Sequence, residues 1–143
     1  MRKIMFLFLM LFSGLQMLAQ EENVVKEASH KVIFQMTSSD QAEQKALLNN
    51  LNNLKNLWGT DVQIHVVIHG PGIGMVMNEK TAFKEGIYKV LDRGVVFQAC
   101  ENTLKQKNIE KSEILERIEF VPSGLAEIIT KQEQGWTYIK SNF

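Results

Sequence analysis

Apolar residues in this 143-residue chain alternate between two kinds of spacing, and this alternation limits the folds that the chain can adopt. Short, nearly continuous apolar runs with the composition of strands occupy residues 31–37, 62–68, 95–99, 118–121 and 136–140. Between them, apolar residues recur at intervals of three and four, which is the spacing of a helix face. Strands that alternate with helices predict one three-layer α/β/α domain with a five-stranded, mostly parallel sheet of the flavodoxin-like class.

The order of strands in such a sheet decides where a ligand can bind. Ligands lie beyond the carboxyl ends of the strands, at the point where the strand order reverses. We expect the order 2-1-3-4-5, which puts this point between the first and third strands. Ser38, Ser39 and Asp40, which follow the first strand, would then face Cys100, which follows the third.

Cys100 is the single cysteine of the chain, so it has no partner for an internal disulfide. It precedes a predicted helix, and the free amides at the helix start would favour a thiolate, whereas Glu101 next to it would oppose one. Glu101, Asn102 and Thr103, which open this helix, are candidate binding residues. Two interpretations stay open at this point: a nucleophilic or sulfur-carrying thiol, and a small buried apolar side chain.

Other candidate binding residues follow the second and fourth strands. His69 could act as a base or a donor, but the expected strand order places it about 10 Å from Cys100, two strand spacings away. Gly70 and Gly72 belong to a glycine-rich run that matches no phosphate-binding motif, so it either offers amides to an anion or forms a tight turn. Ser123 stands at the end of the fourth strand. Three scattered histidines and one cysteine predict no metal site, and we expect no cofactor, with a flavin or nucleotide as the least supported alternative.

The first residues have the layout of a secretory signal peptide. Arg2 and Lys3 precede an uncharged apolar run over residues 4–12, and small residues lead to a cleavage point after Ala19. The run is about half the length that a membrane-spanning helix needs. We therefore expect a signal peptide over residues 1–19, an N-terminal arm over 20–29, a domain over 30–143, and an exported, periplasmic protein without a stable membrane anchor.

Charge and apolar surface bear on the partners of the chain. The 16 basic and 16 acidic side chains balance and are scattered, which gives no footprint for nucleic acid. Residues 32–34 and 136–139 offer apolar side chains at the expected sheet edges, which indicates a homo-oligomer.

Several segments together resemble the exported branch of the DsrE/DsrF-like family. The most specific are the Cys-Glu-Asn-Thr run from Cys100 and the His-Gly-Pro-Gly-Ile run from His69, and residues 30–35, 47–54 and 121–124 with 135–136 complete the pattern. The resemblance spans residues 29–140 and implies a YchN-like fold, a trimer or hexamer, and a persulfide carried on Cys100.

The leading hypothesis is an exported sulfur-handling protein that acts as a sulfur carrier or as a sulfurtransferase. It would receive sulfur from a donor and pass it to an acceptor, each of them a protein or a small thiol. The alternative is a non-catalytic oligomeric module that binds a small anion or a partner protein, in which Cys100 is structural.

Overall fold

The computed structural model of the chain describes residues 28–141. Strands and helices alternate along this range as the spacing predicts. The elements are β1 (His30–Met36), α2 (Gln41–Trp58), η2 (Gly59–Asp61), β2 (Val62–Ile68), η3 (Gly70–Val76), α3 (Lys84–Leu91), β3 (Val95–Cys100), α4 (Glu101–Lys107), η4 (Lys111–Glu113), β4 (Glu119–Val121), α5 (Gly124–Glu133) and β5 (Thr137–Lys140).

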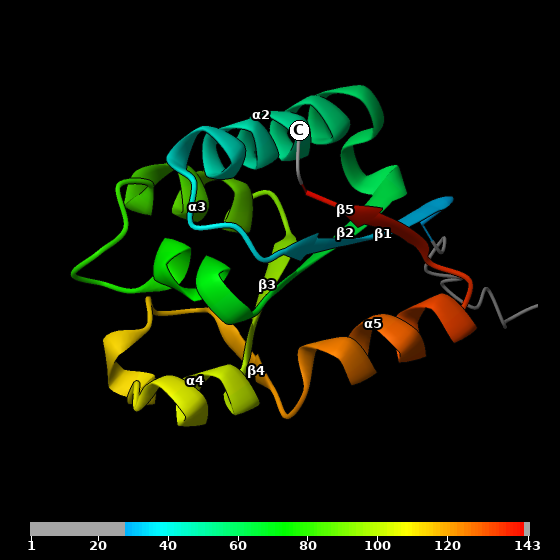
Figure 1. The fold of residues 1–143 in the computed structure, drawn as a ribbon. Coiled ribbons are helices and arrows are strands. Elements are labelled where there is room, and N and C mark those ends of the chain that lie inside the picture. The colour runs from blue at the N-terminus through cyan, green and yellow to red at the C-terminus, as the bar shows by residue number, and fades with distance from the viewer. Residues whose placement is uncertain (1–27, 142–143) are drawn as a thin grey trace, which may run out of the picture.

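The five strands form one parallel sheet in the order β4-β3-β2-β1-β5 (Figure 1). The α/β class and the parallel sheet are confirmed, but the expected order 2-1-3-4-5 is wrong. The chain adds β2, β3 and β4 in one direction from β1, and only β5 returns to the other side of β1. Consecutive strands lie side by side in most sheets, and the apolar spacing that predicts strands does not encode their order.

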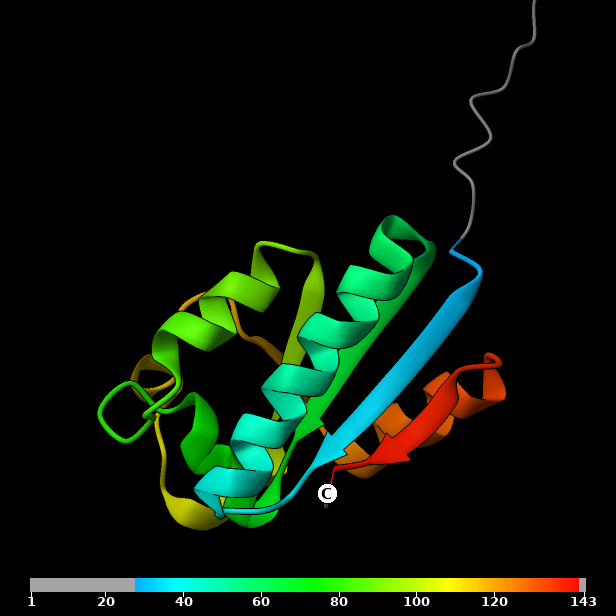
Figure 2. The same cartoon turned by 90° about the horizontal axis from the view of Figure 1, so that it is seen from above.

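The connections cover the two faces of the sheet unequally. Right-handed crossovers in one direction put α2, α3 and α4 on one face, and the reversed crossover puts α5 on the other. Seen from above, α2 lies over the sheet beside β1, and α5 lies behind the sheet, where it packs against β1, β2, β3 and β5 (Figure 2). Leu104 of α4 accordingly belongs to the large core cluster, whereas Ile128 of α5 packs with Ile33 and Val67 in a small one.

Local chemistry sets the ends of α2, the longest helix. The Asp40 carboxylate accepts hydrogen bonds from the amides of Ala42 (2.6 Å) and Glu43 (3.2 Å), which leaves fewer free amides in the first turn. Gly59 ends the helix at φ +54°, a left-handed conformation that glycine adopts without strain. The 3₁₀ turns η3 and η4 were not predicted, since so short a helix leaves too little periodicity to read.

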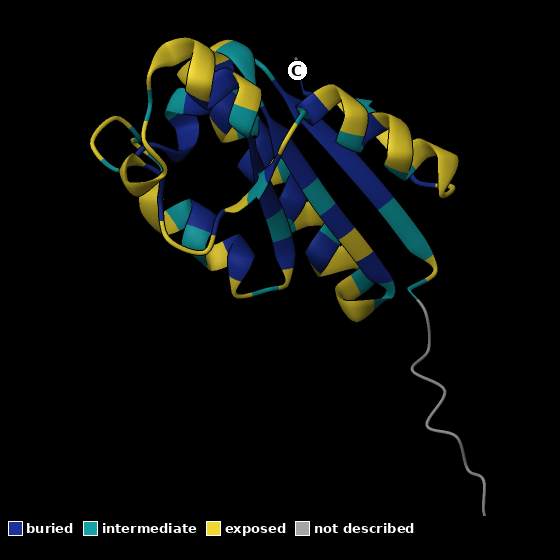
Figure 3. Ribbon diagram, turned by 90° about the horizontal axis from the view of Figure 1, so that it is seen from below, coloured by how far each residue is buried: buried dark blue, intermediate teal, exposed yellow. Residues whose placement is uncertain are grey.

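The sheet and the inner sides of the helices are buried, and the outer sides of the helices are exposed (Figure 3). β1 lies inside the sheet, so residues 32–34 are buried and are not at an edge, contrary to the sequence-based expectation. Of the large apolar side chains in β5, Tyr138 is exposed and Ile139 is partly buried. No helix among residues 28–141 has the length and apolarity to cross a membrane.

Candidate functional site

Cys100 lies where the strand connections diverge. β3 leads into α4 on one face of the sheet, and β4 leads into α5 on the other, so the crevice expected in an open α/β sheet lies between the carboxyl ends of β3 and β4. Cys100 pairs with Val121 in the strand register at this end. The switch point is therefore beside Cys100, as predicted, but its other side is formed by β4 and not by β1.

The thiol of Cys100 is buried, with 5% of the residue exposed, and its surroundings are polar. The amide of Gly124, the first residue of α5, donates a hydrogen bond to the Sγ atom at 3.2 Å. Burial raises the pKa of the Cys100 thiol, but hydrogen bonds from the Gly124 amide, the Thr103 amide and hydroxyl, and the Asn102 amide lower it, and the net shift is downward. The site thus favours a thiolate although it excludes most solvent.

Thr103 joins the thiol to the glycine-rich segment. It is buried in α4, and its hydroxyl oxygen accepts a hydrogen bond from the Gly70 amide at 3.0 Å. The Gly72 amide donates to the His69 carbonyl at 3.2 Å. Both glycine amides are engaged within the protein, so this segment supports the thiol site and does not present these donors to an anion.

His69 lies beside Cys100, which corrects the expected separation of about 10 Å. β2 and β3 are neighbours, and Ile68 pairs with Ala99, so the next positions along the two strands are His69 and Cys100. A β-carbon added to Gly124 would lie 3.3 Å from Cδ2 of His69, which shows that the imidazole packs against the residue whose amide binds the thiol. Burial lowers the pKa of His69 and keeps the ring neutral.

The expected residues after β1 lie elsewhere. β2 separates β1 from β3, so Ser38, Ser39 and Asp40 do not face Cys100. Asp40 caps α2, and its own amide donates to the Ser38 hydroxyl at 3.1 Å. Ser39 is exposed. These residues organise the start of a helix, which is the ordinary role of such side chains after a strand.

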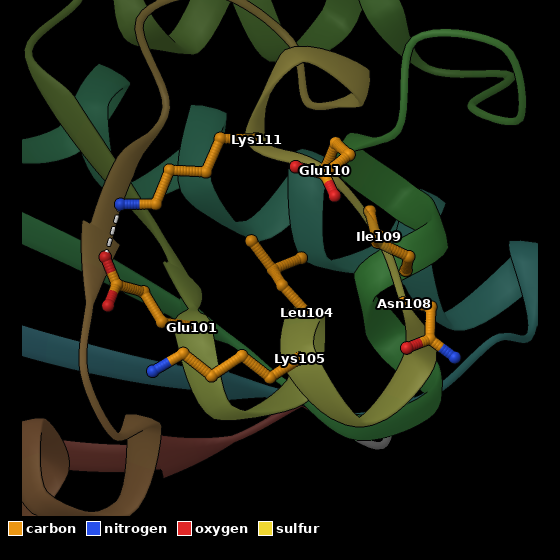
Figure 4. Close-up of a pocket in the computed structure, with 7 residues that line it drawn as sticks. All are labelled: Glu101, Leu104, Lys105, Asn108, Ile109, Glu110 and Lys111. Atoms are coloured by element: carbon orange, nitrogen blue, oxygen red, sulfur yellow. Dashed lines mark hydrogen bonds and ion pairs between the residues drawn. The ribbon is translucent and has the colours of Figure 1, made fainter.

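Glu101 and Ser123 also face away from the thiol. The Glu101 carboxylate pairs with the Lys111 ammonium at 2.5 Å, and this hydrogen bond lowers the pKa of Glu101 (Figure 4). The pair borders a pocket of about 550 Å³ between α4 and η4, which Cys100 does not line. Ser123 caps α5 by accepting from the Ala126 amide at 3.4 Å. The negative charge next to the thiol is therefore partly neutralised by Lys111.

Sequence reasoning missed three residues around the site: Gly124, Gln35 and Tyr138. Gly124 entered the sequence analysis only within the segment 121–124 of the family resemblance, although its amide is the one that reaches the thiol. Gln35 lies in β1, next to β2, and Tyr138 lies in β5, on the other side of β1; a polar residue inside an apolar strand was the available clue. Within residues 28–141, no group of three or more His, Cys, Asp or Glu side chains is arranged to hold a metal ion.

Solved structures resemble the chain over most of its length. The protein of unknown function MTH1491 from Methanobacterium thermoautotrophicum is 28% identical, with a TM-score of 0.74 over 78% of this chain and 98% of that one. BT1422 from Bacteroides thetaiotaomicron, also of unknown function, is 18% identical, with a TM-score of 0.66 over 80% and 97%. The ychN protein of E. coli is 10% identical, with a TM-score of 0.62 over 78% and 98%.

These likenesses confirm the expected YchN-like fold. BT1422 and the ychN protein are so distant in sequence that their likeness bears on the fold alone. None of the curated proteins compared matches the chain. The DsrE/DsrF-like family matches residues 30–141, which is nearly all of the part that the structure describes. The resemblance drawn from the Cys-Glu-Asn-Thr and His-Gly-Pro-Gly-Ile segments is thereby confirmed, and the chain belongs to the DsrE/DsrF-like family.

Proposed function

We propose that the chain is a sulfur-handling protein that carries sulfur as a persulfide on Cys100. The family to which it belongs is associated with sulfur relay. The observation that carries the proposal is the hydrogen bond from the Gly124 amide to the Cys100 sulfur, at the switch point of the sheet. A cysteine that is only packed against apolar side chains has no such donors, and its pKa rises on burial.

The proposed reaction begins with attack of the Cys100 thiolate on a sulfane sulfur. The Gly124 and Thr103 donors that stabilise the thiolate would also stabilise the persulfide anion that replaces it. Since the chain has one cysteine, no second thiol of its own can remove the sulfur. The acceptor is then a partner protein or a small thiol, and the protein acts as a carrier or as a sulfurtransferase.

Intact mass after incubation with a sulfane sulfur donor tests the carrier proposal. We expect a gain of one sulfur atom in the wild-type protein and none in Cys100→Ser. Thr103→Val is the matched variant, because both side chains are branched at the β-carbon and valine lacks the hydroxyl. We expect alkylation of Cys100 in this variant to need higher pH, since a group that lowers the pKa of the thiol is lost.

The burial of Cys100 favours a second candidate, a non-catalytic binding module in which the cysteine is structural. This candidate predicts that the thiol is labelled only as fast as the protein unfolds. Labelling that follows the ionisation of the thiol in the native state contradicts it. Labelling limited by unfolding contradicts the carrier proposal.

We also propose that the protein is exported to the periplasm. The proposal rests on the order of basic, apolar and small residues over positions 1–19, which lie outside the described residues. Mature protein from a cell-envelope fraction should begin at Gln20 or within a residue or two of it. Soluble protein that retains Met1 would contradict the proposal.

A further inference from the structure

A hydroxyl group connects the glycine-rich segment to the thiol. Thr103 is buried in α4, and its Oγ1 atom accepts a hydrogen bond from the Gly70 amide at 3.0 Å. The same hydroxyl donates a hydrogen bond to the Cys100 sulfur. A hydroxyl has a single hydrogen to donate, so Thr103 stabilises the sulfur only while its O–H bond is turned towards it. Whatever sets this orientation also sets how well the thiolate is stabilised.

The Gly70 amide restricts the rotation of the Thr103 hydroxyl. An amide N–H donates and does not accept, so the O–H bond cannot point towards Gly70. A threonine inside a helix otherwise tends to bond a carbonyl of the preceding turn. A hydroxyl that accepts a hydrogen bond is also polarised, which strengthens the bond that it donates. The amide therefore both orients and strengthens the contact between Thr103 and the Cys100 sulfur.

The backbone at Gly70 is held in a conformation that favours glycine. Its φ of +56° lies in the left-handed region, where most side chains are strained. A β-carbon there would meet no atom within 4 Å, so the strain of a substitution would come from the backbone and not from a clash. The His69 amide donates to the Met36 carbonyl at 3.2 Å, and the Gly72 amide donates to the His69 carbonyl at 3.2 Å. These bonds hold the segment around Gly70 against the end of β1.

We propose that Gly70 is a positioning residue for the Cys100 thiol and acts through the hydroxyl of Thr103. This inference deepens the proposed carrier function, and its consequence for sulfur transfer rests on that function. It gives the glycine-rich run that starts at His69 a role other than phosphate binding, since the run supplies its amide to Thr103. Two strand connections then serve the thiol: Gly124 donates to the sulfur directly, and Gly70 acts one hydrogen bond further away.

Among the described residues, hydrogen bonds rather than a cation stabilise the thiolate. Burial raises the pKa of the Cys100 thiol, and the interactions that lower it are hydrogen bonds. The charged side chains on the elements around the thiol are Glu101 of α4 with its partner Lys111, Glu119 of β4, and Glu127 of α5 with its partner Lys131. η3 contains no charged residue. A change at Gly70 therefore alters the donors of the thiol without altering any charge.

The His69 ring, although it lies beside Cys100, is engaged elsewhere. Its Nε2 atom lies 2.7 Å from the amide nitrogen of Gln35, whose amide oxygen accepts a hydrogen bond from the Tyr138 hydroxyl. Burial lowers the pKa of His69, so the ring is neutral. The backbone that follows His69, and not its imidazole, is thus the part of this segment that acts on the thiol.

The ratio of thiolate to thiol in the folded protein tests the inference without sulfur transfer. The ultraviolet absorbance of the thiolate measures this ratio against pH, with Cys100→Ser as the baseline. We expect Thr103→Val to lower the ratio about tenfold at a fixed pH, the loss of one hydrogen bond to a charged group. Thr103→Ser keeps the hydroxyl and should stay within about twofold of the wild type. Gly70→Ala should lower the ratio about threefold, because the hydroxyl remains but is no longer oriented.

Two further variants separate the position of the amide from general strain. Gly59→Ala is the matched control, because Gly59 has a φ of +54°, a β-carbon there meets no atom within 4 Å, and it lies at the opposite end of β2. It should lower the melting temperature about as much as Gly70→Ala does and leave the thiolate ratio unchanged. Gly70→Asn introduces a residue that tolerates a left-handed φ, so it should keep more of the wild-type ratio than Gly70→Ala.

A double-mutant cycle assigns the effect to the Thr103 hydroxyl. When Thr103→Val has removed the hydroxyl, the addition of Gly70→Ala should lower the ratio by less than about 1.5-fold. An equal loss in both backgrounds overturns the inference, and so does a Gly70→Ala ratio no lower than that of Gly59→Ala. A wild-type ratio in Thr103→Val overturns it too, and this result does not require any Gly70 variant to fold.

Sulfur uptake from inorganic polysulfide, measured by intact mass, connects the inference to the carrier function. The Cys100 thiolate takes one sulfur atom, and the polysulfide leaves one atom shorter with the electron pair of the broken S–S bond. Gly70→Ala should slow uptake by less than its ratio falls, because a thiolate of higher pKa is more nucleophilic. A wild-type protein that takes up no sulfur overturns the carrier function, whereas the titration still decides the role of Gly70. The two failures are therefore distinguishable.

Discussion

One face of the sheet is covered by α2, α3 and α4 over 24 buried apolar residues, whereas the face under α5 has a cluster of four. The alternation of side chains along the strands produces this difference. Phe97 and Ala99 point into the large cluster, so Gln98 and Cys100 point to the other face. His65, His69 and Gln35 lie on that face too. Apolar burial on the first face stabilises the fold, and it allows the second face to hold polar groups that cost stability.

The largest expected loss of stability comes from replacing a core residue, and we compare one such residue from each face of the sheet. Phe97→Ala should lower the free energy of unfolding by about 3–5 kcal/mol, because a fully buried ring is lost from a tightly packed cluster. Ile128→Ala, under α5, should cost about 2 kcal/mol, the low end for such a change, since its cluster is small. Urea unfolding measures both. Equal costs would contradict the division of the two faces.

The periodicity that predicted the elements is local, and this explains what sequence could and could not provide. Residues such as Leu47 and Leu51 report which side of their own helix is buried, so helices were expected between the strands, and the strand ends were placed to within about one residue. Strand order depends on how distant segments pack, so the neighbour of Cys100 was misplaced and His69 was set one strand too far away. The contact between Gln35 and Tyr138 joins residues 103 apart, and no local pattern reveals it.

The second prediction concerns close packing on the face of the sheet that α2, α3 and α4 cover. A β-carbon on Gly72 would lie 2.7 Å from the Met36 carbonyl oxygen, and the backbone of β1 has little room to move. Gly72→Ala should therefore destabilise the protein by about 1–3 kcal/mol. Gly74→Ala is the matched control in the same 3₁₀ segment, where a β-carbon meets no atom within 4 Å, and should change stability by less than about 0.5 kcal/mol. Similar melting shifts for the two variants would disprove the contact.

The third prediction is that acid lowers the stability of the protein through the histidines on the face under α5. Burial lowers the pKa of His65 and of His69, and Lys131 lowers that of His65 further. The unfolded chain therefore binds more protons than the folded one as pH falls below the ordinary histidine value, so stability is full above that value and is lost below it. The slope is at most about 1.4 kcal/mol per pH unit for each histidine.

Urea unfolding at pH 7 and pH 5 measures this loss. The double variant His65→Gln with His69→Gln should lose less stability between the two values than the wild type does. Phe97→Leu, on the other face, is the control, and it should keep the wild-type dependence on pH. If the double variant lost as much as the wild type, the pH dependence would have to come from groups other than these histidines.

The smallest expected effect on stability tests the outer side of α5, where we propose that copies of the chain associate. Leu125 and Ile129 lie four residues apart and are 58% and 55% exposed, so they form one apolar strip on a helix that covers the polar face. Leu125→Glu should change the free energy of unfolding of the monomer by less than about 0.5 kcal/mol, because a solvent-exposed side chain contributes little to folding. It should nevertheless shift the protein to smaller species in light scattering at micromolar concentration.

Leu57→Glu is the matched control. Leu57 is 70% exposed on α2, and we expect its replacement to leave the assembly unchanged. A wild-type protein that is already monomeric would contradict the proposed trimer or hexamer. If both variants dissociated the assembly equally, the result would contradict an interface on α5. If only Leu125→Glu dissociates the assembly, the helix whose first amide binds the Cys100 sulfur also holds the subunits together, and sulfur uptake should then depend on protein concentration.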